Sequence, residues 1–206
     1  MLHKEAIEQD TLELLIKLQQ DDILKNFSLA GGTALALQIG HRTSDDLDLF
    51  TQQDFNTNQL LEYLESSYNF ILYYSARNTL KGVIGNVNLD FIAHKYPLAG
   101  NSITAGVIRL LSIEDIAAMK LNVIAADGTR AKDFIDIYFI LKRFNLSQIL
   151  GFYSTKYTKR NQFHILKSLS YFDDIDVTAW PKMILETDLN FSMLKSVLIS
   201  HVKTLS

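Results

Sequence analysis

Two aspartates, Asp46 and Asp48, stand one residue apart in the stretch "DLDLF", and their spacing suggests a chemical role. Successive side chains of a strand point to opposite faces, so the two carboxylates share one face while Leu47 and Leu49 share the other. Two like charges so close repel each other unless a cation or a proton lies between them. Mg²⁺ meets that need, because it takes one or two carboxylates and completes its octahedron with water and phosphate oxygens. A strand with one solvated face is the alternative interpretation.

Two adjacent glycines, Gly31 and Gly32, precede this pair in "LAGGTALALQIGHRTSDDLDLF", residues 29–50. A turn with two glycines lets the backbone approach a ligand, and a helix opening at Thr33 would direct free N–H groups and its positive dipole end at a phosphate. Glycine pairs also mark ordinary turns, and Arg42 and Ser44 could be plain loop residues. The stretch predicts either a tight turn beside a solvated strand or a site that binds both an anion and a cation.

Lys120 lies on the apolar stripe of a predicted helix over residues 112–126. The stripe consists of Ile113, Ile116, Ala117, Lys120 and Ile124, which are the positions that face a core. An unpaired ammonium is costly to bury, so Lys120 needs an anionic partner or a route to solvent. Asp133 borders the apolar stripe of the next helix and is the natural partner. On this pattern alone, methionine in place of Lys120 should remove activity at little cost in stability. Arg130, Lys132 and Asp136 could be ordinary solvated residues, an interpretation favoured for Lys132.

A third carboxylate, Asp90, stands between Leu89 and Phe91 in the β-like run "NVNLDFIAH". Alternation along the strand directs the two apolar neighbours to one face and Asp90 to the other. Asp90 is therefore either a third ligand for a cation on Asp46 and Asp48 or a strand residue that faces solvent.

The elements that would position these residues are strands and helices up to about residue 110 and helices afterwards. We expect helices over the first twenty residues and at 33–40 and 56–67, strands at 27–30 and 46–50, and the β-like runs "FILYYSA", "TLKGVIG" and "NVNLDFIAH". Further helices are expected at 112–126 with Ser112 as N-cap, at about 130–144, and after Pro181. The expected organisation is an α/β domain over residues 1–110 with a leading helix and a helical domain over 111–206.

The composition bounds the class of protein. The chain has 206 residues, of which 48% are hydrophobic, so it can bury a core, and a disordered chain is excluded. No run approaches the roughly 18 apolar residues of a membrane span, and the charged N-terminus is unlike a signal peptide, which predicts a cytoplasmic protein without a membrane partner. Without cysteines, any metal must be bound by oxygen or imidazole, and the five histidines have no metal-binding spacing, so hard cations are favoured. The net charge of −3 combines an acidic first half with a mildly basic second half.

The motifs resemble those of the AbiEii/AbiGii-type nucleotidyltransferase toxins, a branch of the polymerase-β-like nucleotidyltransferase superfamily. The segments "GGT" at 31–33, "HRTS" at 41–44 and "DLDLF" at 46–50 are similar to the first motif of that family. Downstream, "SIEDIAAMKLNVIAADGTRAKDFIDIYFIL" is similar to its lysine-bearing helix and R-x-K-D-x-x-D helix, and "LKSLSYFDDID" before a proline resembles its C-terminal segment. Together these segments cover most of residues 29–183.

The resemblance implies an α/β polymerase-β-like domain with a small mixed sheet, which moves a nucleoside monophosphate from an NTP to an acceptor hydroxyl and releases pyrophosphate. It implies catalytic roles for Asp46, Asp48, Lys120 and Asp133, nucleotide binding by Gly31, Gly32, Thr33, Arg42 and Ser44, and metal binding by Asp46, Asp48 and Asp90. The implied cofactor is Mg²⁺ in a two-metal site, with Mn²⁺ as a substitute. The implied setting is a bacterial toxin–antitoxin or phage-defence pair, with a cognate antitoxin and with tRNA or another RNA as acceptor.

Two other functions are compatible with the same residues. A nucleotidyltransferase with a small-molecule acceptor, such as an antibiotic, would share the catalytic strand but need a carboxylate-lined pocket for a cationic substrate. A non-catalytic module that kept the fold to bind a nucleotide or partner belongs to another class, and the presence of Asp46, Asp48 and Lys120 argues against it.

Residues 153–167 combine basic and aromatic side chains without an acidic one. They comprise Lys156, Lys159, Arg160 and Lys167, interleaved with Tyr153, Tyr157 and Phe163. Such a mixture can pair with phosphates and stack on unpaired bases. An amphipathic helix that packs its aromatic residues inward and solvates its lysines is the commoner outcome of the same pattern.

Overall fold

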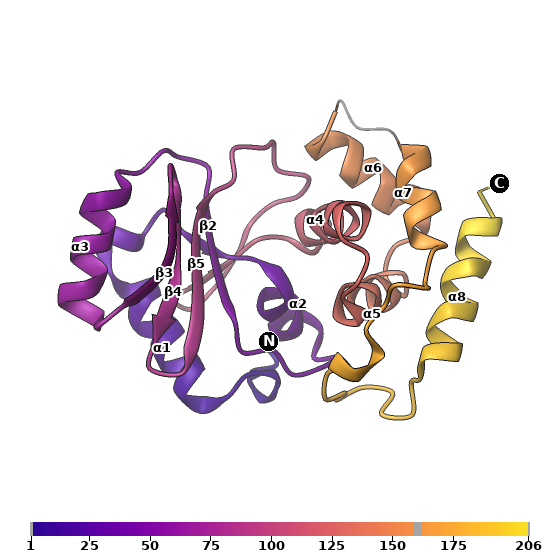
Figure 1. The fold of residues 1–206 in the computed structure, drawn as a ribbon, viewed down its shortest axis with the longest axis horizontal. Coiled ribbons are helices and arrows are strands. Elements are labelled where there is room, and N and C mark those ends of the chain that lie inside the picture. The colour runs from indigo at the N-terminus through magenta and orange to yellow at the C-terminus, as the bar shows by residue number, and fades with distance from the viewer. Residues whose placement is uncertain (1, 159–161, 206) are drawn as a thin grey trace.

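The computed structural model of the chain describes residues 2–158 and 162–205, and these residues form a mixed α/β protein with a seven-stranded sheet (Figure 1). The helices are α1 (Gln9–Gln20), α2 (Gly31–Ile39), α3 (Thr57–Tyr68), α4 (Ile113–Ala126), α5 (Ala131–Ile140), α6 (Leu146–Lys156), α7 (Gln162–Leu169) and α8 (Phe191–Lys203). The strands are β1 (Ser28–Leu29), β2 (Leu47–Thr51), β3 (Ile71–Ala76), β4 (Thr79–Ile84), β5 (Val87–Ala93), β6 (Ile103–Ala105) and β7 (Ile108–Leu110).

The sheet has the strand order β3-β4-β5-β2-β1-β7-β6. β2 pairs with β5 in parallel, and β1 pairs with β7 in parallel, whereas the other neighbours are antiparallel. The expected mixed sheet is therefore present. Its central strand is β2, which carries Asp48 and is directly preceded by Asp46.

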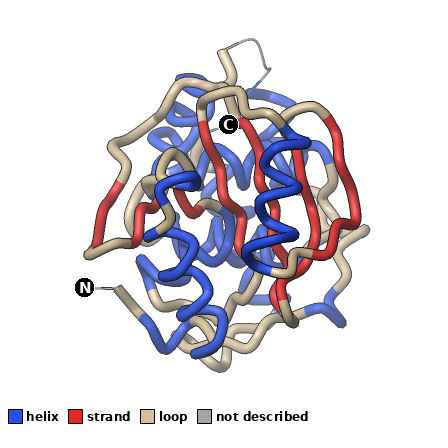
Figure 2. The backbone as a smooth tube through the Cα atoms, turned by 90° about the vertical axis from the view of Figure 1, so that its left-hand side faces the viewer, coloured by secondary structure: helices blue, strands red, loops and turns tan. Residues whose placement is uncertain are grey.

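Helices cover the two faces of the sheet unequally. Figure 2 shows α3 lying over the face of β3 and β4 that is turned away from the helical half, and these elements are in contact. On the other side, α2 packs against β2, α4 and α5 (Figure 1). Leu47 and Leu49 of β2 are buried in the core, as their alternation with the aspartates predicts. The face that carries the carboxylates is thus turned toward α4 and α5.

Local caps explain where several helices begin. Ser112 accepts a hydrogen bond from the N–H of Asp115 and starts α4, which is the predicted cap. α6 was not expected from the sequence, and it begins at Leu146 because Asn145 and Gln148 form a reciprocal capping box. The small β6–β7 hairpin was also not expected from the sequence.

No helix among the described residues has the length and apolar character needed to cross a membrane.

The segment after Pro181 is extended rather than helical, and α8 starts only at Phe191. The N–H of Thr43 donates to the carbonyl of Lys182 at 3.0 Å, and the N–H of Ile184 donates to the carbonyl of His41 at 2.9 Å. These bonds commit the backbone of residues 182–184 to the loop that precedes β2. The Lys182 carbonyl and the Ile184 N–H that these bonds occupy cannot also form helical hydrogen bonds, so the helix predicted directly after Pro181 is displaced toward the C-terminus.

The basic and aromatic segment is mostly turned inward. Lys156 is buried and its Nζ lies 2.6 Å from Oδ1 of Asp115, while Tyr153 and Tyr157 are buried as well. These three side chains cannot contact an RNA, which corrects that part of the expectation. Phe163 and Lys167 are exposed on α7, and Lys159 and Arg160 lie outside the described residues.

Candidate active site

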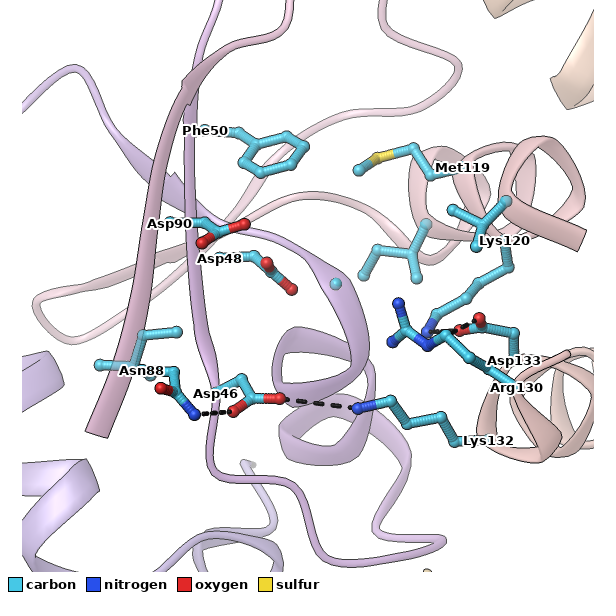
Figure 3. A pocket seen from close by; sticks show the side chains of 14 residues that line it. Asp46, Asp48, Phe50, Asn88, Asp90, Met119, Lys120, Arg130, Lys132 and Asp133 are labelled. Carbon is cyan, nitrogen blue, oxygen red and sulfur yellow. Dashed lines mark hydrogen bonds and ion pairs between the residues drawn. The ribbon is translucent and has the colours of Figure 1, made fainter. Parts of the chain in front are cut away.

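Three aspartates line one wall of a cleft between the sheet and the helices (Figure 3). Asp48 lies on β2, Asp90 lies on the neighbouring parallel strand β5, and the register pairs these two residues directly. Asp46 lies immediately before β2 and two residues from Asp48, so its side chain shares the same face. The cleft has a volume of about 360 Å³.

The two outer carboxylates of this wall have partners. Nδ2 of Asn88 donates to Asp46 at 3.2 Å, and Nζ of Lys132 lies 3.6 Å from the other carboxylate oxygen of Asp46. Asp90 forms an ion pair with Lys81 of β4. The charges of Asp46 and Asp90 are therefore each balanced by a lysine.

Asp48, between them, carries the unbalanced charge. Its carboxylate has no hydrogen bond or ion pair with any residue in the described part of the chain. Burial, together with the negative charge of Asp90, raises the pKa of Asp48 to about 6, although the positive charge of Lys120 acts in the opposite direction. The centre of the acidic wall thus favours either a proton or a cation.

A side chain at Gly31 and a side chain at Gly32 would each overlap a different neighbour. Gly31 has a φ of +65°, and a Cβ at this position would overlap the Oδ2 of Asp48. A Cβ on Gly32 would overlap the guanidinium of Arg42. The glycine pair therefore brings the start of α2 into direct contact with both the acidic wall and a buried arginine.

Residues of the first turn of α2 line the cleft and its adjoining cavity, namely Gly31, Gly32 and Thr33. Ala30, at the N-cap position, provides no side-chain hydrogen bond to the N–H groups that follow it. The Thr33 hydroxyl donates to the carbonyl of Asp46 at 2.5 Å, so its only proton is used, and Ser44 must be the donor in the 2.9 Å contact between the two hydroxyls. The side chains of Thr33 and Ser44 thus hold the turn in place, and the groups left for an anion are the backbone N–H groups.

A buried ionic cluster lies behind this turn. Arg42 donates from Nε to Oδ1 of Asp136 at 2.7 Å and from its terminal nitrogen to Oδ2 at 2.9 Å. His41 Nε2 is also 2.7 Å from Oδ1 of Asp136. Burial alone would raise the pKa of the Asp136 carboxyl. The positive charges of Arg42 and Lys120 lower it by more, so the pKa of Asp136 lies well below its usual range. Asp136 is therefore ionised, and His41 donates to it as a neutral imidazole, since burial lowers the pKa of His41.

Lys120 extends the cluster toward the cleft. Its Nζ lies 2.6 Å from Oδ1 of Asp133 and 2.6 Å from Oδ2 of Asp136, and burial of the ammonium is outweighed by these two carboxylates, so the pKa of Lys120 is raised. Asp133 is the partner that the helical stripe predicted. Two positive charges, on Arg42 and Lys120, balance two negative charges, on Asp133 and Asp136, and the buried set is neutral.

Cations face the acidic wall from the helical side. Figure 3 shows Arg130, Lys132 and Lys120 across the cleft from the three aspartates. Nε of Arg130 lies 3.4 Å from Oδ2 of Asp133, and both Arg130 and Lys132 are partly exposed to the cleft. Lys132, for which a solvated role was favoured from the sequence, is 35% exposed, lines the cleft and approaches Asp46.

The structure brings the candidate residues to one place. Asp46, Asp48, Asp90, Lys120, Asp133 and Gly31 line the cleft, and Gly32, Thr33, Arg42 and Ser44 line a small adjoining cavity that also reaches Asp46 and Asp48. Asp136, which the sequence left as a candidate solvated residue, is completely buried. Its position three residues after Asp133, on the same helical face, was the available signal. His41 and Lys81 had no comparable signal.

The donor set fits a hard divalent cation. Among residues 2–158 and 162–205, no three His, Asp or Glu side chains are arranged closely enough to form a metal-binding group as they stand. The wall nevertheless consists of carboxylate oxygens, which Mg²⁺ and Mn²⁺ prefer, and Asp48 lacks a counter-charge. Asp46, Asp48 and Asp90 are thus suited to the cation, given a local adjustment of the outer two.

Comparison of the chain with known proteins identifies a family and a relative. The sequence model of the family described as "Nucleotidyl transferase AbiEii toxin, Type IV TA system" matches residues 13–97 and 82–193. The chain is 31% identical over 175 residues to an uncharacterized protein of Aquifex aeolicus (strain VF5), a match that covers 82% of this chain and 84% of the relative.

Two solved structures share the fold. A crystal structure from H. pylori, assigned as a nucleotidyltransferase, is 20% identical, has a TM-score of 0.56, and covers 96% of this chain and 97% of that chain. The solution structure of the antibiotic-resistance factor ANT(2'')-Ia is 16% identical, has a TM-score of 0.55, and covers 77% of this chain and 95% of that chain. At these identities the likeness concerns the fold.

Replacement of Lys120 by methionine should destabilise the protein, contrary to the expectation from the helical stripe. The variant leaves Asp133 and Asp136 with one buried cation fewer, and breaking a buried ion pair from one side costs about 3 kcal/mol. Urea unfolding at neutral pH measures the change. Lys167→Met, at an exposed lysine of α7, is the control and should stay within about 0.5 kcal/mol of the parent. Equal stability of the Lys120 and Lys167 variants would contradict the cluster.

Asp48→Asn should make stability less dependent on pH. The pKa of Asp48 is raised to about 6 in the folded chain, so the folded state binds the proton more tightly than the unfolded state does. The stabilisation this gives is complete below about pH 4 and is lost as the pH rises through about 6. In EDTA, the asparagine variant should therefore gain up to about 3 kcal/mol relative to the parent between pH 4 and pH 8. A difference in unfolding free energy between variant and parent that does not change with pH would refute the raised pKa of Asp48.

Proposed function

The chain belongs to the AbiEii family of nucleotidyl transferase toxins, and from this premise we propose that it transfers a nucleoside monophosphate from an NTP to a hydroxyl of an RNA. Nucleotidyl transfer is the activity of the family. The acceptor, the cation and the roles of the individual residues are the parts that we propose.

One observation carries the proposal: an acidic and a basic wall face each other across the same cleft (Figure 3). A triphosphate with its cation has a matching charge pattern, because the cation seeks the carboxylates and the remaining phosphate charge seeks lysine and arginine. A cleft of about 360 Å³ falls within the size range of small-molecule sites. Neither wall alone would favour a nucleotide over another ligand.

The triphosphate lies, in this proposal, between the first turn of α2 and the start of α5. The backbone N–H groups of Gly31, Gly32 and Thr33 bind phosphate oxygens, as the uncapped N-terminus of a helix favours. Arg130 and Lys132 neutralise the outer phosphates from the opposite wall. Arg42 and Ser44 act indirectly, since Arg42 is saturated by Asp136 and Ser44 donates to Thr33.

Asp46, Asp48 and Asp90 would hold one or two Mg²⁺ ions, or Mn²⁺ in their place. When bound, the cation would polarise the acceptor hydroxyl and neutralise charge on the triphosphate. Gly31 leaves the space that the Asp48 carboxylate needs to reach it. Lys120 and Asp133 join α4 to α5 and so hold the helical side of the cleft together.

In the reaction, the acceptor oxygen forms a bond to the α-phosphorus while the bond from that phosphorus to the bridging oxygen breaks, and pyrophosphate leaves. The hydroxyl proton passes to the carboxylate of Asp90, which is 25% exposed and can release it to solvent. Arg130 and Lys132 stabilise the negative charge that develops on the departing pyrophosphate.

We propose that residues 1–110 form the catalytic domain and that residues 111–206 form a helical domain supplying Lys120 and Asp133.

We also propose a biological setting on the basis of the family. The acceptor is tRNA or another RNA. A cognate antitoxin would accompany a toxin of this type, within a toxin–antitoxin or phage-defence pair.

Incubation of the protein with each labelled NTP, Mg²⁺ and total cellular RNA tests the proposal. We expect label from one preferred NTP to enter an RNA species, with release of pyrophosphate. The Asp48→Asn variant should lose at least about a thousandfold in rate while keeping the parental circular dichroism spectrum, because this carboxylate serves the cation rather than the core.

Label that enters RNA equally with the parent and the variant would reject the site. A parallel incubation replaces the RNA with an aminoglycoside, and label that enters this small aminated acceptor but not RNA, still in an Asp48-dependent way, would keep the site and reject the acceptor. No transfer from any NTP to any acceptor would reject the function proposed here.

A further inference from the structure

Lys81 occupies the position next to the third carboxylate. The register pairs Lys81 of β4 with Asp90 of β5, and Asp90 with Asp48 of β2. Directly paired residues of neighbouring strands point to the same face, so Lys81 shares the face of Asp90 and Asp48. Lys81 was not a candidate from the sequence, because only the strand order places it there.

The ion pair between Lys81 and Asp90 uses a carboxylate that the cation would also need. Oδ2 of Asp90 is the oxygen that contacts the Lys81 ammonium. An ammonium and a divalent cation repel each other, so both cannot approach that carboxylate closely at the same time. In the described residues the three aspartates do not yet form a metal-binding group, in keeping with an outer carboxylate that is already engaged.

We propose that Lys81 is an internal competitor for the divalent cation: it neutralises Asp90 in the cation-free protein and is displaced when the cation binds. The inference rests on the proposed function and adds a regulation to that site. Competition by Lys81 makes the affinity for the cation lower than it would be if all three carboxylates were free. The active site is therefore assembled only at a sufficient cation concentration. Lys81 is a positioning residue in this role and need not touch the substrate.

The surroundings of Lys81 allow the displacement. Its side chain is 43% exposed, so the ammonium can move into solvent without a large loss of packing. A β-bulge in β3 between Leu72 and Tyr74 adds an extra residue, Tyr73, beside the pair of Tyr74 with Lys81. Tyr73 and Tyr74 are 65% and 54% exposed, so the sheet beside Lys81 is open to solvent.

Titration of Mn²⁺ with the full chain, followed by electron paramagnetic resonance of the free ion, tests the competition. Lys81→Met should bind Mn²⁺ about two- to fivefold more tightly than the parent at low salt, which is the range for the loss of an exposed ion pair. The difference should shrink at high salt, because exposed charges are screened. Asp90→Asn and the Lys81→Met/Asp90→Asn double variant should have equal affinities, since no carboxylate is left to compete for.

Lys95→Met is the matched control. Lys95 pairs with Asp54 at a similar exposure of 45%, and neither residue lines the cleft. Its Mn²⁺ affinity should equal that of the parent. Thermal unfolding of each variant verifies the fold, and a purely structural Lys81 would lower the melting temperature without changing the affinity.

The outcomes separate this inference from the function on which it rests. Unchanged or weaker Mn²⁺ binding by Lys81→Met would overturn the competition, even if Asp48→Asn abolishes binding and thereby supports the cation site. Mn²⁺ binding that is absent in the parent, or unaffected by Asp48→Asn, would reject the cation site and the competition together.

Discussion

The active site depends on a neutral set of four buried charges. Arg42 comes from the loop after α2, Lys120 from α4, and Asp133 and Asp136 from α5. A buried charge without its partner is strongly unfavourable, so each member fixes the place of the others. Because the loop after α2 leads into β2, the same contacts set the distance between the acidic wall of the sheet and the basic wall of the helices.

The acidic wall is arranged in a different way. Lys132 and Lys81 balance its outer carboxylates from opposite sides, and Asp48 is left without a partner among the described residues. Gly31 leaves room for this carboxylate at the start of α2, where a side chain would overlap it. The two walls thus combine a support whose buried charges balance one another with a centre whose charge is balanced only by a ligand or a proton. That division fits a protein in which stability and ligand binding are served by separate residues.

Local patterns predicted much of the fold and the site, and distant contacts account for what they missed. Alternation placed Leu47 and Leu49 in the core and the aspartates outside it, and the apolar stripe of α4 predicted a partner for Lys120. The burial of Asp136 depends on Arg42, 94 residues away in the chain, and no periodicity reports such a contact. Lys156 was assigned to solvent because its buried partner, Asp115, lies on another helix. The start of α8 was missed because residues 182–184 bond to the loop before β2.

That last connection has a consequence for synthesis of the chain. The backbone bonds from Thr43 to Lys182 and from Ile184 to His41 join the middle of the first motif to a segment near the C-terminus. During translation the chain emerges from its N-terminus, and such a long-range contact can form only after most of it has been made. A growing chain that ends before residue 182 holds every aspartate of the acidic wall but lacks the segment that braces the loop beside it. The loop beside the acidic wall is therefore braced only after residues 182–184 have been synthesised.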